Sequence, residues 1–544
     1  MLSSPFTSKF GTNYSAGDNE VTEIETILIE PSRRLEFLDD EIAKMQRVID
    51  KLTEERNTLA AYIDGHRSLL SPMRRLPRDI IQEIFIACMP TDRNCVMSAT
   101  EAPILLGRIC SAWRAISFST PRLWADIHIV EPDYRTREMS LSNGFLDLVN
   151  AKLKQRLEVT EAWLHRSGQC GLSITVFCTT PMPQQTRSPI IQAIIPLAPR
   201  WEHISLTASD IVLANLPTFS DGDMPMLKSL CINEVQTMFP EGHRWDTMSL
   251  CRAPQLSRFS ASGSCFRPLE LPLRWDRLLE LSLVKTSPPT LSSDMALQVL
   301  SWCSVLRTFK ALVEDYTDAG GVSVPPLEHA SLRTLDFECM GSLSSTALQL
   351  TGRLLLPDLR HFLIHGSTAG NEDDISRISY APFLAASSKI THVKVMLIMF
   401  TKSSLAEFIR CLPQTTEKLE VLRVLSWGPG YMINQIYIDE DILSLLDPSL
   451  HTPAASVSCP RLQDLTLKDC TSISDETLRD FIISRMRDGA HSKMRRIVVR
   501  FPRAMEVDIM PDLREFVENG LQVELHYYLL GSPEFSPWAG LSDD

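Results

Sequence analysis

The segment Leu462–Ile482, LQDLTLKDCTSISDETLRDFI, carries the clearest structural signal of this chain. Its first half alternates apolar and polar residues, a pattern that predicts a short strand. Leu465 and Leu467 stand two positions apart, so both side chains point to the same core, while Leu462 anchors the turn that leads into the strand.

The second half of this stretch predicts a helix. Either Ser474 or Asp475 can cap its first turn. The apolar residues that follow fall on one helical face and form a buried stripe: Leu478, Phe481 and Ile482. One strand and one helix cannot bury their apolar sides alone, so units of this kind stack on their neighbours.

Similar triplets recur along the chain, with most starts within the ~20–29-residue leucine-rich period or slightly beyond. They are Trp201/Ile204/Leu206, Leu227/Leu230/Ile232, Leu278/Leu281/Leu283, Leu306/Phe309/Ala311, Leu332/Leu335/Phe337, Leu359/Phe362/Ile364, Ile390/Val393/Val395, Leu419/Leu422/Val424, Leu462/Leu465/Leu467 and Met494/Ile497/Val499, with Leu256/Phe259/Ala261 as a weaker candidate. The long gap after Leu419 must hold an insertion. Outer-layer helices are expected at Met295–Leu300, Leu405–Leu412, Ile442–Leu446 and Leu478–Ile483.

The Leu462 unit resembles the cysteine-containing leucine-rich repeats, with Cys470 at the strand exit. The resemblance implies an irregular leucine-rich-repeat solenoid over residues 201–530. Residues 131–200 supply linking helices and a first strand, and residues 531–544 form a tail. Because the other units are degenerate, a non-repeating α/β domain stays open as the alternative.

A second informative stretch lies upstream and predicts two short amphipathic helices. It reads LLSPMRRLPRDIIQEIF over 69–85 and APILLGRICSAWRAISFSTPRLWADIHI over 102–129. Pro77 suits the first turn of a helix, where its missing N–H costs nothing. The apolar stripes are Ile80, Ile81, Ile84, Phe85 and Cys88, followed by Leu105, Ile109, Trp113 and Ile116. With no long core of their own, these helices are expected to bury their stripes against a partner protein.

This second stretch resembles an F-box, the adaptor-binding module of cullin-RING ubiquitin ligases. The match begins at Leu76-Pro77, includes Ile84-Phe85 and ends with Cys110, Trp113, Arg114 and Pro121–Trp124. The order of a short coiled coil, this segment and a repeat region is similar to a large fungal F-box family. The resemblance implies a three-helix F-box module over residues 69–130.

The resemblance also implies a partner, an adaptor of the Skp family and through it a cullin. The residues that would dock the adaptor are Leu76, Pro77, Ile80, Ile81, Ile84 and Phe85. Leu105, Ile109 and Trp113 would complete the module or touch the adaptor, and plain domain core is the alternative for all these apolar residues. The segment Met89–Pro103 is longer than the turn usual there, which leaves the register of the second helix open.

Residues 33–68 have the heptad pattern of a short coiled coil. The core positions are Leu35, Leu38, Ile42, Met45, Ile49 and Leu52, with Arg56 on the next a position before Leu59 and Ile63 resume the pattern. The helix can pack back on its own domain, or it can serve self-association or a partner helix. Residues 1–32 are polar and small at their start and are expected to be disordered.

Composition excludes several classes of function. The 544 residues carry a formal charge of -13, and the densest basic cluster is Arg74, Arg75 and Arg78, so no nucleic-acid partner is expected. No apolar run approaches the ~20 residues that span a bilayer, and the N-terminus lacks a secretory signal. The expected location is the cytoplasm, the nucleus or both, with no membrane partner.

The sequence offers no catalytic motif. It contains no P-loop, GxGxxG, HExxH or GxSxG pattern, and none of its 13 cysteines forms a CxxC pair. His361 and His365 fall on a predicted strand without an identifiable third ligand, so neither a metal nor a cofactor is expected. The acidic runs at 372–374 and 439–441 suit solvated loops. The aromatic residues near predicted loops, which suit packing or contact with a target, are Trp245, Trp275, Trp427, Tyr431 and Trp538.

The sequence therefore predicts an α/β protein in which N-terminal helices and a three-helix module precede an irregular repeat solenoid. The function implied by the resemblance is that of a non-catalytic substrate receptor of an SCF-type ubiquitin ligase, which holds an unknown target protein. A protein-interaction scaffold built on leucine-rich repeats, outside any ligase, is the alternative. An enzyme of unfamiliar type is the third hypothesis.

Overall fold

The computed structural model describes residues 4–70, 72–132, 143–178, 187–235, 244, 248–286, 290–315, 326–341, 343–366, 379–423, 438–450, 457–469, 471–489 and 491–527. The chain divides into two compact units, Met1–Ile84 and Phe85–Asp544. The division falls inside helix α2 (Arg78–Ala87), and therefore inside the segment predicted as one module over 69–130.

The first unit is dominated by one long helix, α1 (Asp18–Leu69), with short 3-10 turns at Thr7–Lys9 and Pro72–Arg75. The helix predicted over 33–68 is present, but it begins earlier, so the expectation of disorder up to residue 32 is wrong for residues 18–32. Asp18 and Glu20 in the first turn favour this start, since acidic side chains stabilise the positive end of the helix dipole.

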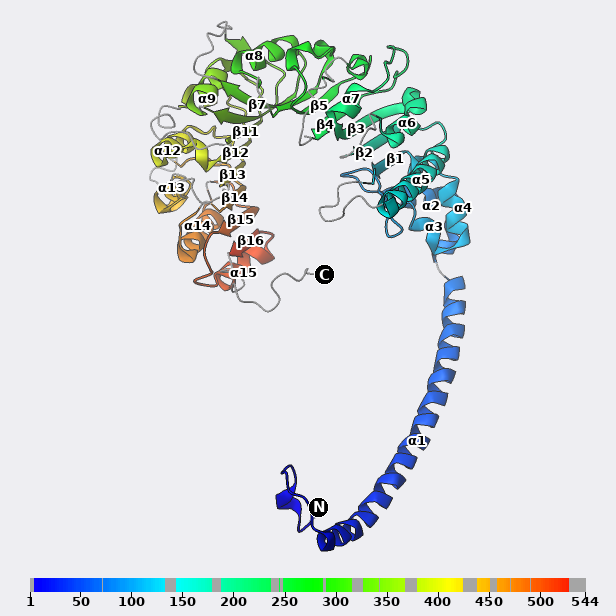
Figure 1. The fold of residues 1–544 in the computed structure, drawn as a ribbon. Coiled ribbons are helices and arrows are strands. Elements are labelled where there is room, and N and C mark those ends of the chain that lie inside the picture. Colours follow the sequence, from blue (N-terminus) through cyan, green and yellow to red (C-terminus); the bar gives the residue numbers. More distant parts are fainter. Residues whose placement is uncertain are drawn as a thin grey trace. The chain divides into compact units, whose positions relative to one another are not determined.

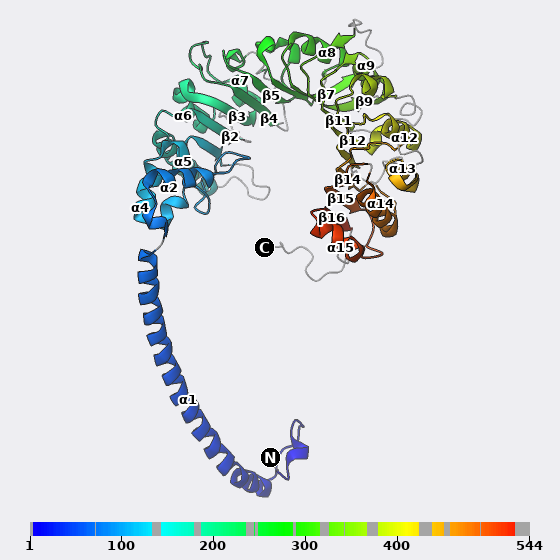
Figure 2. The same ribbon diagram turned by 180° about the vertical axis from the view of Figure 1, so that it is seen from behind.

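The second unit is built on a single sheet of 14 strands in which every neighbouring pair is parallel and sequential in the chain. Figures 1 and 2 show the strands on the inner side of this unit and the helices on its outer side. The strands are β1 (Asp126–Val130), β2 (Leu172–Cys178), β3 (Trp201–Ser209), β4 (Ser229–Val235), β5 (Arg258–Gly263), β6 (Glu280–Lys285), β7 (Thr308–Asp315), β9 (Thr334–Gly341), β11 (His361–Gly366), β12 (His392–Met396), β13 (Lys418–Leu422), β14 (Asp464–Lys468), β15 (Arg496–Phe501) and β16 (Gln522–Tyr527). A separate pair joins β8 (Leu327–Glu328) to β10 (Leu354–Leu355).

The helices of the second unit mostly alternate with these strands. They are α3 (Leu106–Ile109), α4 (Ser111–Phe118), α5 (Asn143–Arg166), α6 (Pro189–Ile194), α7 (Asp210–Ala214), α8 (Ser293–Trp302), α9 (Leu343–Thr351), α11 (Ala381–Ala386), α12 (Lys402–Cys411), α13 (Glu440–Ser444), α14 (Asp475–Arg487) and α15 (Met510–Glu518). The fold class is therefore α/β, as predicted. All four helices expected from apolar segments are present as α8, α12, α13 and α14.

The core of the second unit is formed by the predicted triplets. In the unit of β4, for example, Leu227 before the strand and Leu230 and Ile232 within it are all buried, and the same three positions are buried in the units of β3 and β5. The weaker candidate Leu256/Phe259/Ala261 is one of these units and supplies β5. Stacked rows of this kind give the sheet its core, because each strand buries its apolar side against the next.

One triplet was predicted in the wrong register. The buried residues of β13 are Leu419 and Val421, with Thr416 in the first position, and Leu422 lies on the opposite face of the sheet. The prediction of Leu419/Leu422/Val424 is therefore wrong. Val424 lies outside the described residues.

The sheet also begins before the predicted repeat boundary at 201. Strand β1, expected inside the module at 69–130, pairs with β2, and β2 pairs with β3. Residues 126–130, which the sequence places at the end of the 69–130 segment, are therefore the first strand of the sheet.

Candidate functional site

In the first unit, the segment that carries the candidate docking residues has both buried and exposed apolar side chains. Pro77 precedes the first residue of α2 and is exposed, and Leu76 and Ile84 are half-buried. Ile81 is buried, whereas Ile80 is 44% exposed. The predicted face of α2 is therefore divided, and Ile80 and Pro77 are the residues available to a partner.

In the second unit, Phe85 and Trp113 are in direct contact. Their ring centroids lie 4.9 Å apart at an angle of 59°, and Phe85 has no exposed surface. Trp113 lies in the first turns of α4, whose N-cap is Cys110, since the Trp113 backbone N–H donates to the Cys110 Sγ at 3.4 Å. Phe85 is thus a core residue that supports Trp113.

Two exposed aliphatic residues of this part of the second unit flank α3, since Leu105 is its N-cap and Ile109 its last residue. Leu105 and Ile109 are 42% and 56% exposed, respectively. The Arg114 Nε donates to the Gly107 carbonyl oxygen at 2.8 Å, which fixes α3 against α4. Two large aliphatic side chains at the two ends of α3 are therefore held in place and remain exposed.

Helix α4 is fixed to the sheet by a group of aromatic side chains. Trp124 packs edge-on against Trp163, with centroids 4.8 Å apart, and its indole N–H donates to the Ser117 carbonyl at 2.8 Å. The Arg166 guanidinium lies over the rings of Trp124 and Phe118. The two tryptophans are almost fully buried, so α4 is packed against α5 and against the turn that leads into β1.

The long connection Met89–Pro103 closes the first edge of the sheet. Val96 forms a parallel bridge with His128 of β1, and the Asn94 side chain exchanges hydrogen bonds with Ser173 and Thr175 of β2. Burial raises the pKa of the Cys95 thiol to about 12. The unusual length of this segment thus has a structural purpose, because it covers strand edges that would otherwise be free to pair.

The second candidate surface is the open face of the sheet, formed by strand residues that alternate with the buried ones. On β2–β6, two residues toward the C-terminal end of each strand face this side and are uncharged: Thr175, Phe177, Ser205, Thr207, Cys231, Asn233, Ser260, Ser262, Ser282 and Val284. On later strands, charged residues pair across the face, as in Lys310–Asp336 at 3.4 Å and Arg496–Glu524 at 2.8 Å.

Histidines gather on this open face between β11 and β13. His361 and His392 stand opposite one another with ring centroids 5.5 Å apart. The His392 Nε2 lies 3.4 Å from a Glu420 carboxylate oxygen, and His392 together with Lys418 lowers the pKa of Glu420 to about 2. His365, four positions after His361, instead lies 3.3 Å from Asp336. Within the described part of the chain, no group of three or more His, Cys, Asp or Glu is placed to hold a metal ion.

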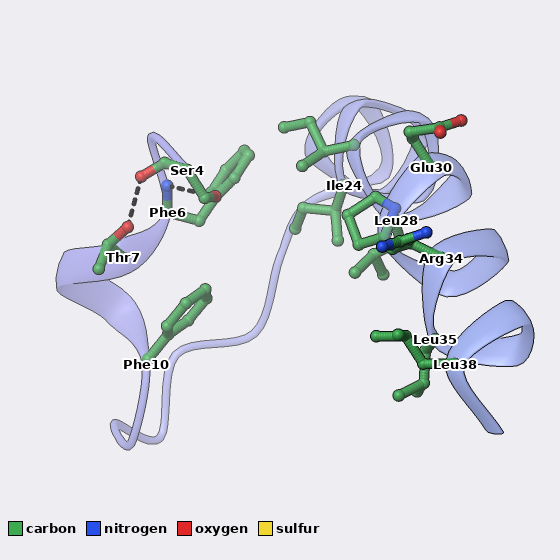
Figure 3. A pocket seen from close by; sticks show the side chains of 12 residues that line it. Ser4, Phe6, Thr7, Phe10, Ile24, Leu28, Glu30, Arg34, Leu35 and Leu38 are labelled. Carbon is green, nitrogen blue, oxygen red and sulfur yellow. Dashed lines mark hydrogen bonds between the residues drawn. The ribbon is translucent and has the colours of Figure 1, made fainter. Parts of the chain in front are cut away.

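A third feature is an apolar groove in the first unit, shown in Figure 3. It has a volume of about 880 Å³ and separates the N-terminal residues Phe6 and Phe10 from α1. On the helix side, the groove is lined by Ile24, Leu28, Leu35 and Leu38, among others. Glu20 holds the N-terminal segment in place, because it accepts hydrogen bonds from Tyr14, Gly17 and Lys9, which lower its pKa to about 2.

Sequence reasoning singled out the candidate docking segment and did not derive the other features. The open face could be derived only after the strands were aligned. The segment 89–103 has no periodic pattern that signals its pairing with β1. Of the aromatic residues proposed near loops, Trp275 packs against Trp302 with centroids 5.5 Å apart. Trp245, Trp427, Tyr431, Trp538, Cys470 and the residues 372–374 and 528–544 lie outside the described residues.

Among the described helices, none combines the length and the apolar content that crossing a bilayer requires. No protein-family model matches the sequence, and no curated protein matches it.

Proposed function

We propose that this chain is a non-catalytic substrate receptor of an SCF-type, cullin-RING ubiquitin ligase. Residues 69–130 dock an adaptor of the Skp family, and the adaptor connects the chain to a cullin. The observation that carries the proposal is the exposure of Leu105 and Ile109 at the two ends of α3, which is tied to α4, the helix whose Trp113 packs on the buried Phe85. Exposed aliphatic residues on a rigid support suit a protein interface.

We further propose that the 14-stranded sheet is an irregular leucine-rich-repeat solenoid. Support comes from the buried triplets, the parallel order of consecutive strands and the helices on the outer side. The target protein binds the open face of this solenoid, where uncharged positions near the C-terminal ends of β2–β6 adjoin the charged pairs of the later strands. The chain works in the cytoplasm, the nucleus or both.

In this role the chain performs no bond chemistry. It holds the target close to the ubiquitin-charged enzyme of the assembled ligase, which raises the effective concentration of target lysines. The contacts of α4 with Trp124, and of Trp124 with Trp163, suit this purpose, because they tie the part of the docking segment that belongs to the second unit to the start of the sheet.

Affinity purification of the full chain with identification of its partners tests the proposal. Recovery of a Skp-family adaptor together with a cullin supports it. Stable partners without an adaptor contradict it and favour the scaffold. The matched control is a chain with Leu105→Asp and Ile109→Asp, which should lose the adaptor and the cullin but keep target proteins.

A further inference from the structure

Helix α1 carries an apolar row that the described residues of its own unit leave exposed. The row, named here the α1 seam, consists of Leu35, Leu38, Ile42, Met45, Ile49, Leu52, Leu59 and Ile63. All eight side chains are exposed, with Ile42 at 63% and Leu52 at 59%. Leu35 and Leu38 also line the open groove of Figure 3, so the seam begins at an unfilled apolar space. So many aliphatic residues on one helical face indicate a missing partner.

The spacing of the seam identifies the kind of partner. Apolar residues alternate by three and four, the 3.5-residue repeat that a straight helix cannot keep on one face unless it supercoils around another helix. Helix α1 itself supplies a second helix with this repeat. Its a positions include Ile42, Ile49 and Ile63, and its d positions include Leu38, Leu52 and Leu59. β-Branched residues at a positions with leucine at d positions favour a parallel coiled coil of two helices.

The charges beside the seam agree with this orientation. In a parallel, in-register pair, Arg34 at a g position faces Asp39 at the following e position of the second copy. Arg56, the one charged residue at an a position of the seam, then lies beside Glu55 of the second copy. A polar residue at a single a position specifies the register of the two helices and limits the coiled coil to two helices, at a cost in stability.

We propose that α1 pairs with α1 of a second copy of this chain in a parallel, in-register coiled coil over Leu35–Ile63. In a parallel pair both helices end at the same end of the coiled coil, and each chain continues from there into its own segment Leu76–Trp113. The assembly therefore has two adaptor-docking segments and two target-binding faces. This last consequence rests on the proposed function, whereas the pairing itself rests on α1 alone.

Sedimentation equilibrium of the purified full chain, without any adaptor, tests the pairing. The expected result is a dimer whose dissociation constant rises roughly tenfold or more in the double variant Ile42→Asp/Ile49→Asp. The matched control is Arg47→Asp/Lys51→Asp, which also introduces two aspartates, but on the exposed side of α1 opposite the seam. It should leave the dimer intact. A monomer at micromolar concentration, or a dimer insensitive to the seam variant, would overturn the proposal.

The orientation is tested by exchanging a charge pair. Arg34→Glu brings like charges together in the parallel pair and should weaken the dimer roughly threefold or more, and Arg34→Glu/Asp39→Arg should restore it. Failure of the double exchange to restore the dimer would overturn the parallel register. Because adaptor binding by the monomeric seam variant is measured separately, failure of this inference and failure of the proposed function are distinguishable.

Discussion

Phe85 lies fully buried beneath the ring of Trp113, with the two ring centroids 4.9 Å apart. The sequence assigns both residues to one candidate interface, but the structure separates their roles. Phe85 supports the position of Trp113, and Trp113, which is half-buried, retains surface that a partner can contact.

The first prediction concerns this pair. Trp113→Ala should weaken adaptor binding by ~2 kcal/mol or more, as truncation of an interface tryptophan does. Phe85→Leu should chiefly loosen α4, which hydrogen exchange of the α4 backbone amides reports as a smaller local opening free energy. A double-mutant cycle between the two positions, measured on the free energy of unfolding, should give a coupling free energy of ~0.5–1.5 kcal/mol. Additive effects of the two substitutions would show that the ring contact is energetically unimportant.

The second prediction concerns Asp475 at the start of α14. Its fully buried carboxylate accepts hydrogen bonds from the Arg503 guanidinium, from the backbone N–H groups of Glu506 and Val507, and from Tyr527. Burial opposes the charged form, but these donors outweigh it and lower the pKa of Asp475. Asp475→Asn should reduce the free energy of unfolding by ~3 kcal/mol or more.

The control for Asp475 is Asp512→Asn, since Asp512 forms an exposed ion pair with Arg479 at 3.4 Å. An exposed pair is worth less than ~1 kcal/mol. Denaturant unfolding of both variants provides the comparison. Equal stability losses would contradict this account of the buried Asp475 carboxylate.

The third prediction is a pH dependence that arises from Glu420. Its pKa is lowered from 4.5 to about 2, first by His392 and then by Lys418. A carboxyl group whose pKa is lower in the folded state than in the unfolded state stabilises the fold. The stabilisation is complete at pH values above the unfolded-state pKa, and it is lost as the pH falls through the folded-state pKa. The contribution should therefore be present above pH 4.5 and disappear toward pH 2.

Denaturant unfolding across this pH range checks the prediction. Glu420→Gln should lower stability at neutral pH and should flatten the acid dependence relative to the unmodified chain. His392→Gln should remove most of the same effect, since it removes the principal partner. An unchanged slope in both variants would rule out the His392–Glu420 interaction as its source.

The fourth prediction concerns Gly263 at the end of β5. Its φ of +150° is rarely adopted by other residues, and an added Cβ would lie 2.4 Å from the Glu234 Cβ. Glu234 cannot move away freely, because its carboxylate accepts hydrogen bonds from the backbone N–H groups of Ser264 and Cys265. Gly263→Ala should cost ~1–3 kcal/mol in stability by denaturant unfolding. Gly222→Ala, where an added Cβ has no neighbour within 4 Å, is the control.

Much of the fold could be predicted from the sequence because each strand carries its own signal. Leu227, Leu230 and Ile232 repeat a spacing that alternation alone identifies as a half-buried strand. The prediction failed at β13, where the buried first position is Thr416 and the run KLEVLRV offers two sets of apolar residues. Only pairing with β12 and β14 decides between them.

The candidate site was predictable in part for a related reason. Helical spacing places Ile80, Ile81 and Phe85 on one face of α2, but it does not show which side chains the chain itself buries. Ile81 and Phe85 are buried, and Ile80 is exposed. Likewise, Arg485 of α14 looks like a solvated charge in the sequence, yet it is fully buried and donates to the Leu462 and Cys459 carbonyl oxygens. Burial is a property of packing between distant segments, which local periodicity does not contain.

The central claim is that the exposed apolar residues of the docking segment bind an adaptor of the Skp family. The most direct measurement is a calorimetric titration of the purified full chain with a purified adaptor, repeated with Ile109→Asp and with Met505→Asp. Ile109 and Met505 are 56% and 55% exposed, so both substitutions place the same charge at equally exposed sites. The account predicts binding by the unmodified chain and by Met505→Asp, and a loss of ~2 kcal/mol or more for Ile109→Asp. The absence of binding by the unmodified chain, or equal affinity of all three proteins, would contradict it.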